Sequence, residues 1–159
     1  MFLDKRMSLG DMVGYWGAQV VGGVLASLAL AWVISKDAVA ATITSVNTAY
    51  VDTFGGFVGE ALLTMVFVMT VLVMAKSTSY SRYLGIGLTL SAVHFIGLGF
   101  TGASVNPARS LAPAIVGGEF ADIWIYIAGP GVGAVLAWVL YKVIVTGDTD
   151  LRDDIKEMM

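Results

Sequence analysis

The chain has 159 residues, of which 57% are hydrophobic and 13% are charged, and it carries a net charge of −3. A soluble domain has about 25% charged residues, so this composition excludes an ordinary soluble domain, and the acidic balance leaves no basic surface for nucleic acid. The absence of Cys excludes a disulfide framework and a thiolate nucleophile. Together with a mean hydropathy of +0.82, these features predict a membrane protein.

Four long apolar stretches are the predicted membrane spans, at residues 12–34, 57–75, 83–100 and 123–141. A spanning helix needs about 20 apolar residues, each adding about 1.5 Å. The only ionisable residues within these stretches, tyrosines aside, are Glu60 and His94. Too little polar sequence remains to cover four such helices in water. The sequence therefore predicts an all-α, polytopic membrane protein with four transmembrane helices.

Lys and Arg are divided unequally between the segments that join these spans. Seven of them lie before the first span, between the second and third, or after the fourth: Lys5, Arg6, Lys76, Arg82, Lys142, Arg152 and Lys156. The opposite side has only Lys36 and Arg109. Because Lys and Arg accumulate in cytoplasmic segments, both termini are predicted to be cytoplasmic in a cell membrane. Residues 146–159 are then a cytoplasmic tail.

The connection between the third and fourth spans predicts a short additional helix. Its centre is the run Asn106, Pro107, Ala108 and Arg109. Asn is a favoured N-cap and Pro suits the first helical position, so a helix is predicted over 106–116 with a stop at Gly117. Its length, about 16 Å, is half a bilayer. Since the connection leaves and returns on one side, we expect a re-entrant half-helix whose preceding irregular backbone lines a watery cavity.

Two of the predicted spans resemble each other. Residues 15–27 align without gaps with 126–138, and six of thirteen positions are identical. The alternative explanation is that both segments simply favour Gly, Ala and Val. Opposite directions in the predicted topology indicate an inverted repeat, in which the transported species binds between the halves. Tyr126 follows Asn106 by 20 residues, so an equivalent Asn would precede Met1, and the chain is expected to begin after a missing half-helix.

The stretch 87–94, together with Thr101-Gly102 and the run from Asn106 to Ser110, resembles the aquaporin (major intrinsic protein) family in its fifth helix and second Asn-Pro-Ala loop. The resemblance extends from the first span, which is similar to the third family helix, to the last, which is similar to the sixth. It implies a partial aquaporin-like inverted-repeat fold in a single truncated domain, 1–159. The first two helices and the first Asn-Pro-Ala motif are missing. Completed by them, the chain is expected to form a homotetramer.

Asn106 and Arg109 are the main candidates for lining a water path. As an N-cap, Asn106 keeps its amide NH₂ for a passing water, and the helix N-terminus repels cations. Arg109 lies on the same helix face, and an intramembrane Arg commonly marks a conduction path. The alternatives are that Asn106 only caps a turn and that Arg109 extends to the outer interface.

The family resemblance implies several further pore residues. His94 is expected to oppose Arg109 and to narrow the opening, as in water-selective members. Ser110 occupies a position where glycerol conductors usually carry Asp, which also favours water. The remaining pore-lining candidates are Ala103, Pro107 and Ala108.

Other residues are predicted to make internal contacts. Glu60 is an expensive carboxylate in hydrocarbon unless it is paired. The resemblance implies that it braces the re-entrant loop by accepting from backbone N–H groups; a role in proton movement is the alternative. Small residues spaced by four predict close helix contacts in two series, Gly14-Ala18-Gly22-Ala26 and Gly129-Gly133-Ala137.

The leading hypothesis is a water channel, with this chain as part of a complete aquaporin. A half-channel or partner subunit without conductance of its own is one alternative, and a channel that also passes glycerol or small neutral solutes is another. A fragment of a different inverted-repeat transporter is less favoured. One His, no Cys and no embedded carboxylate pair disfavour an enzyme. Water and lipid are the expected partners, with no cofactor, metal or nucleic acid. Alone, the chain is expected to add no water permeability, because it lacks part of the pore wall.

Overall fold

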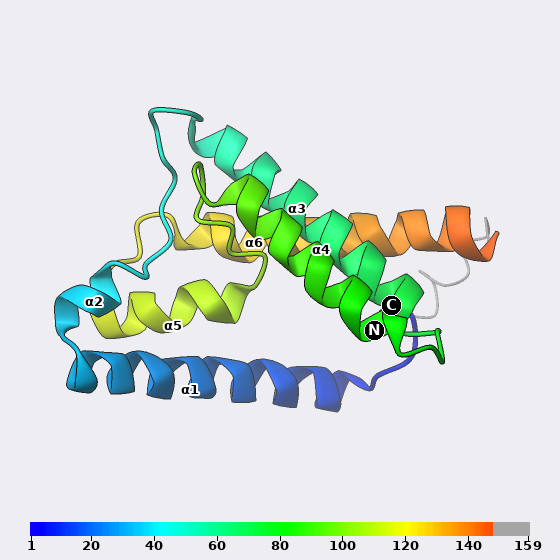
Figure 1. The fold of residues 1–159 in the computed structure, drawn as a ribbon, viewed down its shortest axis with the longest axis horizontal. Coiled ribbons are helices and arrows are strands. Elements are labelled where there is room, and N and C mark those ends of the chain that lie inside the picture. Colours follow the sequence, from blue (N-terminus) through cyan, green and yellow to red (C-terminus); the bar gives the residue numbers. More distant parts are fainter. Residues whose placement is uncertain (148–159) are drawn as a thin grey trace.

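A computed structural model describes residues 1–147, which form helices and irregular connections without a strand (Figure 1). The elements are α1 (Leu9–Val33), α2 (Lys36–Ala40), α3 (Thr53–Met74), α4 (Ser81–Gly97), α5 (Pro107–Gly117), α6 (Ile123–Leu140) and a π-helical segment, η1 (Tyr141–Thr146). The predicted all-α fold class is confirmed. Most of the predicted tail, residues 148–159, lies outside the described residues.

Short polar side chains set where the long helices begin. Ser8 caps α1 by accepting a hydrogen bond from the Asp11 backbone N–H at 3.1 Å. Asp52 caps α3 through the Gly55 N–H at 2.7 Å. These caps satisfy backbone donors that have no partner inside the helix. They explain why both helices start three or four residues before the apolar stretches that predicted them.

Three segments are long and apolar enough to cross a membrane, judged by length and composition: α1, α3 and α6 continued by η1. The third predicted span forms α4, whose 17 residues extend about 25 Å. This helix ends at Gly97, and residues 98–101 form a turn in which the Thr101 N–H donates to the Gly97 carbonyl at 3.0 Å. A fourth spanning helix therefore stays a prediction.

The α6 helix packs closely on α3 through its small residues. A Cβ on Gly133 would lie 2.2 Å from the Ala61 carbonyl oxygen, and one on Gly129 would lie 2.9 Å from the Glu60 Cβ. Without side chains at these positions the two backbones approach each other directly, as in other membrane helix pairs. The predicted contact through this small-residue series is confirmed.

The matching series on α1 makes no such contact among the residues that the structure describes, so close packing through it stays a prediction. A Cβ on Gly14 or Gly22 would meet nothing within 4 Å. Instead Gly23 faces α5, where its Cβ would lie 2.7 Å from the Ala112 Cβ. The spacing identified one face of α1 with small residues, but α5 packs on the neighbouring face of α1.

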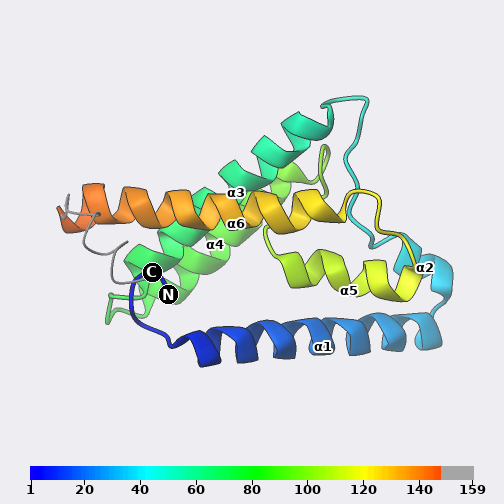
Figure 2. The same ribbon diagram turned by 180° about the vertical axis from the view of Figure 1, so that it is seen from behind.

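The short helix α5 lies beside the second half of α1, as both views of the ribbon show (Figures 1 and 2). The helices α1 and α6 run in opposite directions along the molecule, as the predicted topology requires (Figure 1). The first residues, the α3–α4 connection and η1 lie at one end, and α2 lies at the other. Arg6 and Lys76 both lie over the ring of Tyr141, the first residue of η1.

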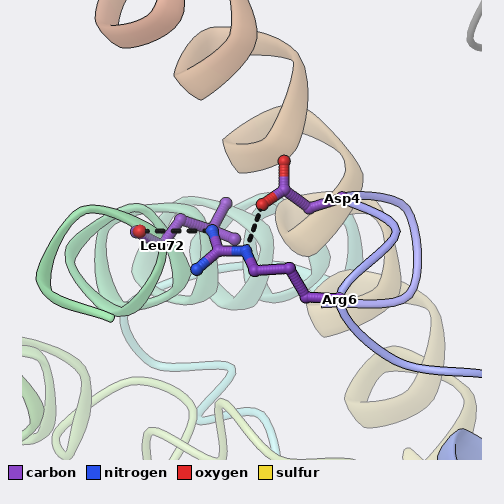
Figure 3. Close-up of polar contacts among 3 residues, drawn as sticks. All are labelled: Asp4, Arg6 and Leu72. Carbon is purple, nitrogen blue, oxygen red and sulfur yellow. Dashed lines mark hydrogen bonds and ion pairs between the residues drawn. The ribbon is translucent and has the colours of Figure 1, made fainter. Parts of the chain in front are cut away.

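The first eight residues fold back over the ends of α3 and α6. Arg6 pairs with Asp4, and its guanidinium donates to the Leu72 carbonyl at 3.4 Å (Figure 3). Leu72 lies in the last turn of α3, where carbonyl groups lack helical partners. Leu3 packs against the cluster that contains Leu72 and Tyr141. This segment therefore joins the two helix ends.

Candidate functional site

The irregular segment before α5 has an unusual backbone. Three of its residues have a positive φ: Gly102 at 76°, Ala103 at 46° and Val105 at 46°. Gly adopts this conformation readily, but a β-branched residue such as Val rarely does, because its side chain crowds the backbone. Neighbouring contacts must therefore hold this segment in place.

Glu60 of α3 provides several of those contacts. Its side chain is completely buried. One carboxylate oxygen accepts from the Thr101 hydroxyl at 2.7 Å and from the Ser104 N–H at 2.9 Å, and the other accepts from the Val105 N–H at 2.9 Å. The Tyr126 hydroxyl of α6 also donates to the Thr101 carbonyl at 2.9 Å. Two helices thus fix the shape of the segment from outside it.

Asn106 and Pro107 start α5 in the way that their sequence predicts. The Asn106 Oδ1 accepts from the Ala108 N–H at 3.0 Å, and Pro107 takes the first helical position. The cap uses the side-chain carbonyl only, so the amide NH₂ is not needed for it. The last helical residue is Gly117, and Gly118, not Gly117 as predicted, is the C-cap that adopts the left-handed conformation, with φ 77°.

Arg109 lines two grooves, and Thr42 lines both as well. The first has a volume of about 530 Å³ and lies between α1 and α5; Asn106, Ala108 and Arg109 line its α5 side. The residues that line its α1 side are Gln19, Gly23, Ala26, Ser27 and Leu30. The second groove, about 630 Å³, lies between residues 41–48 and the end of α4, and Arg109 lines it as well.

The sequence-predicted pore residues are thus only partly brought together. Neither groove is lined by His94, Ala103 or Pro107. The His94 Nδ1 lies 2.8 Å from the Leu90 carbonyl oxygen, which can only accept, so this nitrogen donates. Ala103 is completely buried in a cluster with Val93. Pro107 is exposed.

The groove includes polar residues of α1 that the sequence interpretation missed. Gln19, Gly23 and Ser27 are spaced by four residues, so they share one face of α1. This pattern was available in the sequence. It could be assigned to a groove only after α5 was placed against that face.

The long apolar helices define a helical membrane protein, in which a groove lies beside a short capped helix. The sequence model of the Major intrinsic protein family matches residues 1–141. The chain belongs to this family, whose members are membrane channels and not enzymes.

Individual relatives agree with this assignment. Glycerol uptake facilitator protein-like 6 of Lactiplantibacillus plantarum is 36% identical over 155 residues, which are 93% of this chain and 71% of that relative. Aquaporin-4 of Bos taurus is 31% identical over 161 residues, and Aquaporin-4 of Homo sapiens is 30% identical. Both alignments cover 99% of this chain and 50% of the relative. The chain therefore spans about half the length of these aquaporins.

Proposed function

We propose that this chain forms one wall of a water-conducting pore in a cell membrane, with the path running past Asn106 and Arg109. The observation that carries the proposal is that both residues line the groove between α1 and α5, while Arg109 also lines the second groove. Thr42 lines both grooves as well, so a path from one groove to the other would run beside Thr42 and Arg109.

The polar and charged groups around Asn106 and Arg109 favour the passage of water over that of cations. The Asn106 amide can donate to a water oxygen, and the N-terminus of α5 carries a partial positive charge of about half an elementary charge. Arg109 adds a full positive charge one turn later. No acidic side chain is among the described residues that line the first groove. Cations and hydronium are therefore repelled, while neutral water is not.

Glu60 braces the re-entrant segment in this proposal. Its three hydrogen bonds support a structural role, because both carboxylate oxygens are already occupied. His94 and Ser110 favour water over glycerol by resemblance to water-selective members. Glycerol passage is the second candidate, since the name of one relative refers to glycerol uptake. The half-helix α5, with its N-terminus at the membrane centre, completes this arrangement.

A conducting pore needs more wall than this chain supplies. Asn106 and Arg109 are exposed in the structure, and the chain spans about half the length of the aquaporins it matches. We therefore propose that a further helical segment covers the α1–α5 groove, either from the same polypeptide or from a partner. The completed protein would be a homotetramer with cytoplasmic termini, in contact with lipid and water.

Cysteine accessibility tests whether the groove is wet. The chain lacks Cys, so each introduced thiol is unique. Ala26 lines the groove, whereas its neighbour Leu25 is 62% exposed and lines neither groove. In proteoliposomes that also contain the segment covering the groove, a charged, membrane-impermeant thiol reagent should modify the Ala26→Cys variant and leave Leu25→Cys unmodified. Equal reaction of the two variants would contradict a water path at this position.

Osmotic shrinkage of proteoliposomes tests conduction. The chain alone should give the permeability of lipid, because its groove is not covered. Reconstituted together with the segment of the Lactiplantibacillus relative that its alignment leaves unmatched, it should conduct water faster than glycerol. In those vesicles Arg109→Val should increase the passage of cations and larger solutes. Lipid-level water flux in the mixed vesicles would reject the pore.

A further inference from the structure

Three buried hydroxyl groups form a continuous hydrogen-bonded chain that ends at the pore-side turn. The Thr44 hydroxyl donates to the Ser110 Oγ at 2.7 Å, and Ser110 donates to the Ser104 Oγ at 2.6 Å. Ser104 in turn donates to the Asn106 backbone carbonyl at 2.9 Å. Ser104 and Ser110 are each 1% exposed, and Thr44 is 7% exposed. We call Thr44, Ser110 and Ser104 the hydroxyl relay.

The direction of the relay is fixed by its last acceptor. A carbonyl oxygen cannot donate, so Ser104 must use its single proton on Asn106. Ser104 can then only accept from Ser110, and Ser110 can only accept from Thr44. All three protons therefore point the same way, and hydrogen bonds aligned in this manner strengthen one another.

The relay ends at an atom that both proposed pore residues share. The Asn106 carbonyl accepts from Ser104 and also from the Arg109 backbone N–H at 3.1 Å. Moving this carbonyl would therefore displace the first turn of α5. Ser104 itself cannot follow such a movement freely, because its N–H is held by Glu60 at 2.9 Å.

The other end of the relay is also anchored. Thr44 lies in the connection between α2 and α3, two residues before Val46. The Val46 N–H donates to the Asp122 carboxylate at 3.0 Å, and the Asn47 N–H donates to the Phe100 carbonyl at 2.8 Å. The relay thus extends from a connection held at two points to the turn that carries Asn106 and Arg109.

We propose that Thr44, Ser110 and Ser104 are positioning residues, which set the Asn106 carbonyl and, through it, the first turn of α5. This inference deepens the proposed pore and rests on it for its effect on selectivity. Ser104 and Ser110 act without touching the permeating molecule, since both are buried. The hydroxyl at position 110 therefore has a role beyond being a smaller residue than Asp.

Solid-state NMR of the full chain in lipid bilayers tests the relay directly. The pair Asn106-Pro107 is the only Asn-Pro bond in the sequence, so ¹³C-carbonyl Asn with ¹⁵N-Pro labelling gives one cross-peak. A carbonyl that loses a hydrogen bond moves to lower ¹³C shift. We expect this movement to be largest in Ser104→Ala, smaller in Ser110→Ala and smallest in Thr44→Val.

Two variants separate the relay from general loss of structure. Thr44→Ser keeps the hydroxyl and should restore the wild-type shift. Thr70→Val removes a hydroxyl that bonds only within α3 and should leave the peak in place. If Ser104→Ala does not fold, the comparison of Thr44→Val with Thr44→Ser still shows whether the hydroxyl relay acts on the Asn106 carbonyl. A peak that stays at the wild-type position in both Ser110→Ala and Thr44→Val would overturn the relay.

Permeability separates the relay from the proposed function. In the mixed vesicles described above, Ser110→Ala should raise the ratio of glycerol to water permeability, because the turn with Arg109 is held less firmly. An unchanged ratio would overturn the effect on selectivity. If the wild-type mixture does not conduct, the pore is rejected, while the carbonyl shifts still support or overturn the relay.

Discussion

Glu60 combines complete burial with three accepted hydrogen bonds, and this combination makes it sensitive to a very small chemical change. In Glu60→Gln, one of the two oxygens becomes an NH₂ group, which cannot accept from the N–H groups of Ser104 or Val105. Hydrogen bonds to charged groups contribute about 1.5–3 kcal/mol, so we expect a loss of roughly 2–3 kcal/mol in the free energy of unfolding. Denaturant titration in detergent measures this loss.

Glu119→Gln is the matched control for this change. Glu119 is exposed in the connection between α5 and α6, so its replacement should change the free energy of unfolding by less than about 0.5 kcal/mol. Equal losses in both variants would show that Glu60 does not hold the segment before α5.

Asn106 allows its capping role to be separated from its amide group. Asn106→Ala removes the acceptor of the Ala108 N–H and should lower the free energy of unfolding by about 1 kcal/mol. Asn106→Asp keeps an acceptor and places a negative charge at the positive end of α5, so it should be as stable as wild type or more stable by a few tenths of a kcal/mol. Thermal unfolding compares the two. An Asp variant as unstable as the Ala variant would contradict the cap.

At the scale of helices, the contact between α3 and α6 depends on the missing side chain of Gly133. Ala normally stabilises a helix by about 1 kcal/mol relative to Gly. In Gly133→Ala this gain should be outweighed, because the new methyl group would lie 2.2 Å from the Ala61 carbonyl oxygen. Overpacking of this kind costs about 1–3 kcal/mol. We therefore expect a lower thermal midpoint in detergent.

Gly131→Ala tests the same substitution on the same helix without the clash. A Cβ on Gly131 would meet nothing within 4 Å. This variant should unfold at or above the wild-type temperature. If it is destabilised as much as Gly133→Ala, the close backbone contact is not the cause.

Helices whose ends are set locally were predictable from the sequence. The cap at Asn106 and the Pro that follows it predicted α5 to within one residue at each end. The C-terminal end of α4 was harder to predict, since the chain leaves that helix at Gly97 and soon enters a segment that hydrogen bonds to Glu60 of α3 hold in place. The face of α1 that meets α5 was not predictable from spacing, because two neighbouring faces both carry small residues.

Some features of the candidate site could be predicted from the sequence in the same way, and others could not. Asn106 and Arg109 were expected to share a face because they are three residues apart on one helix. The hydroxyl relay was not visible, because Thr44 and Ser110 are 66 residues apart and the chain contains many other Ser and Thr residues. Only the folded chain selects which hydroxyl groups meet.

For the whole molecule, the distribution of basic residues predicts an orientation that single Cys residues can test. Ser45 and Thr78 are exposed and lie in the α2–α3 and α3–α4 connections. In intact cells, an impermeant thiol reagent should modify Ser45→Cys and leave Thr78→Cys unmodified until the cells are opened. The reverse pattern would invert the predicted orientation.

The bonds from Glu60 to Ser104 and Val105 span 44 and 45 positions of the sequence, which has a consequence for biosynthesis. A ribosome makes the carboxylate long before it makes the backbone that the carboxylate holds. The left-handed conformations at Ala103 and Val105 can therefore settle only against an α3 that has already been delivered to the bilayer. The half-helix should be among the last parts of the nascent chain to become protected from protease.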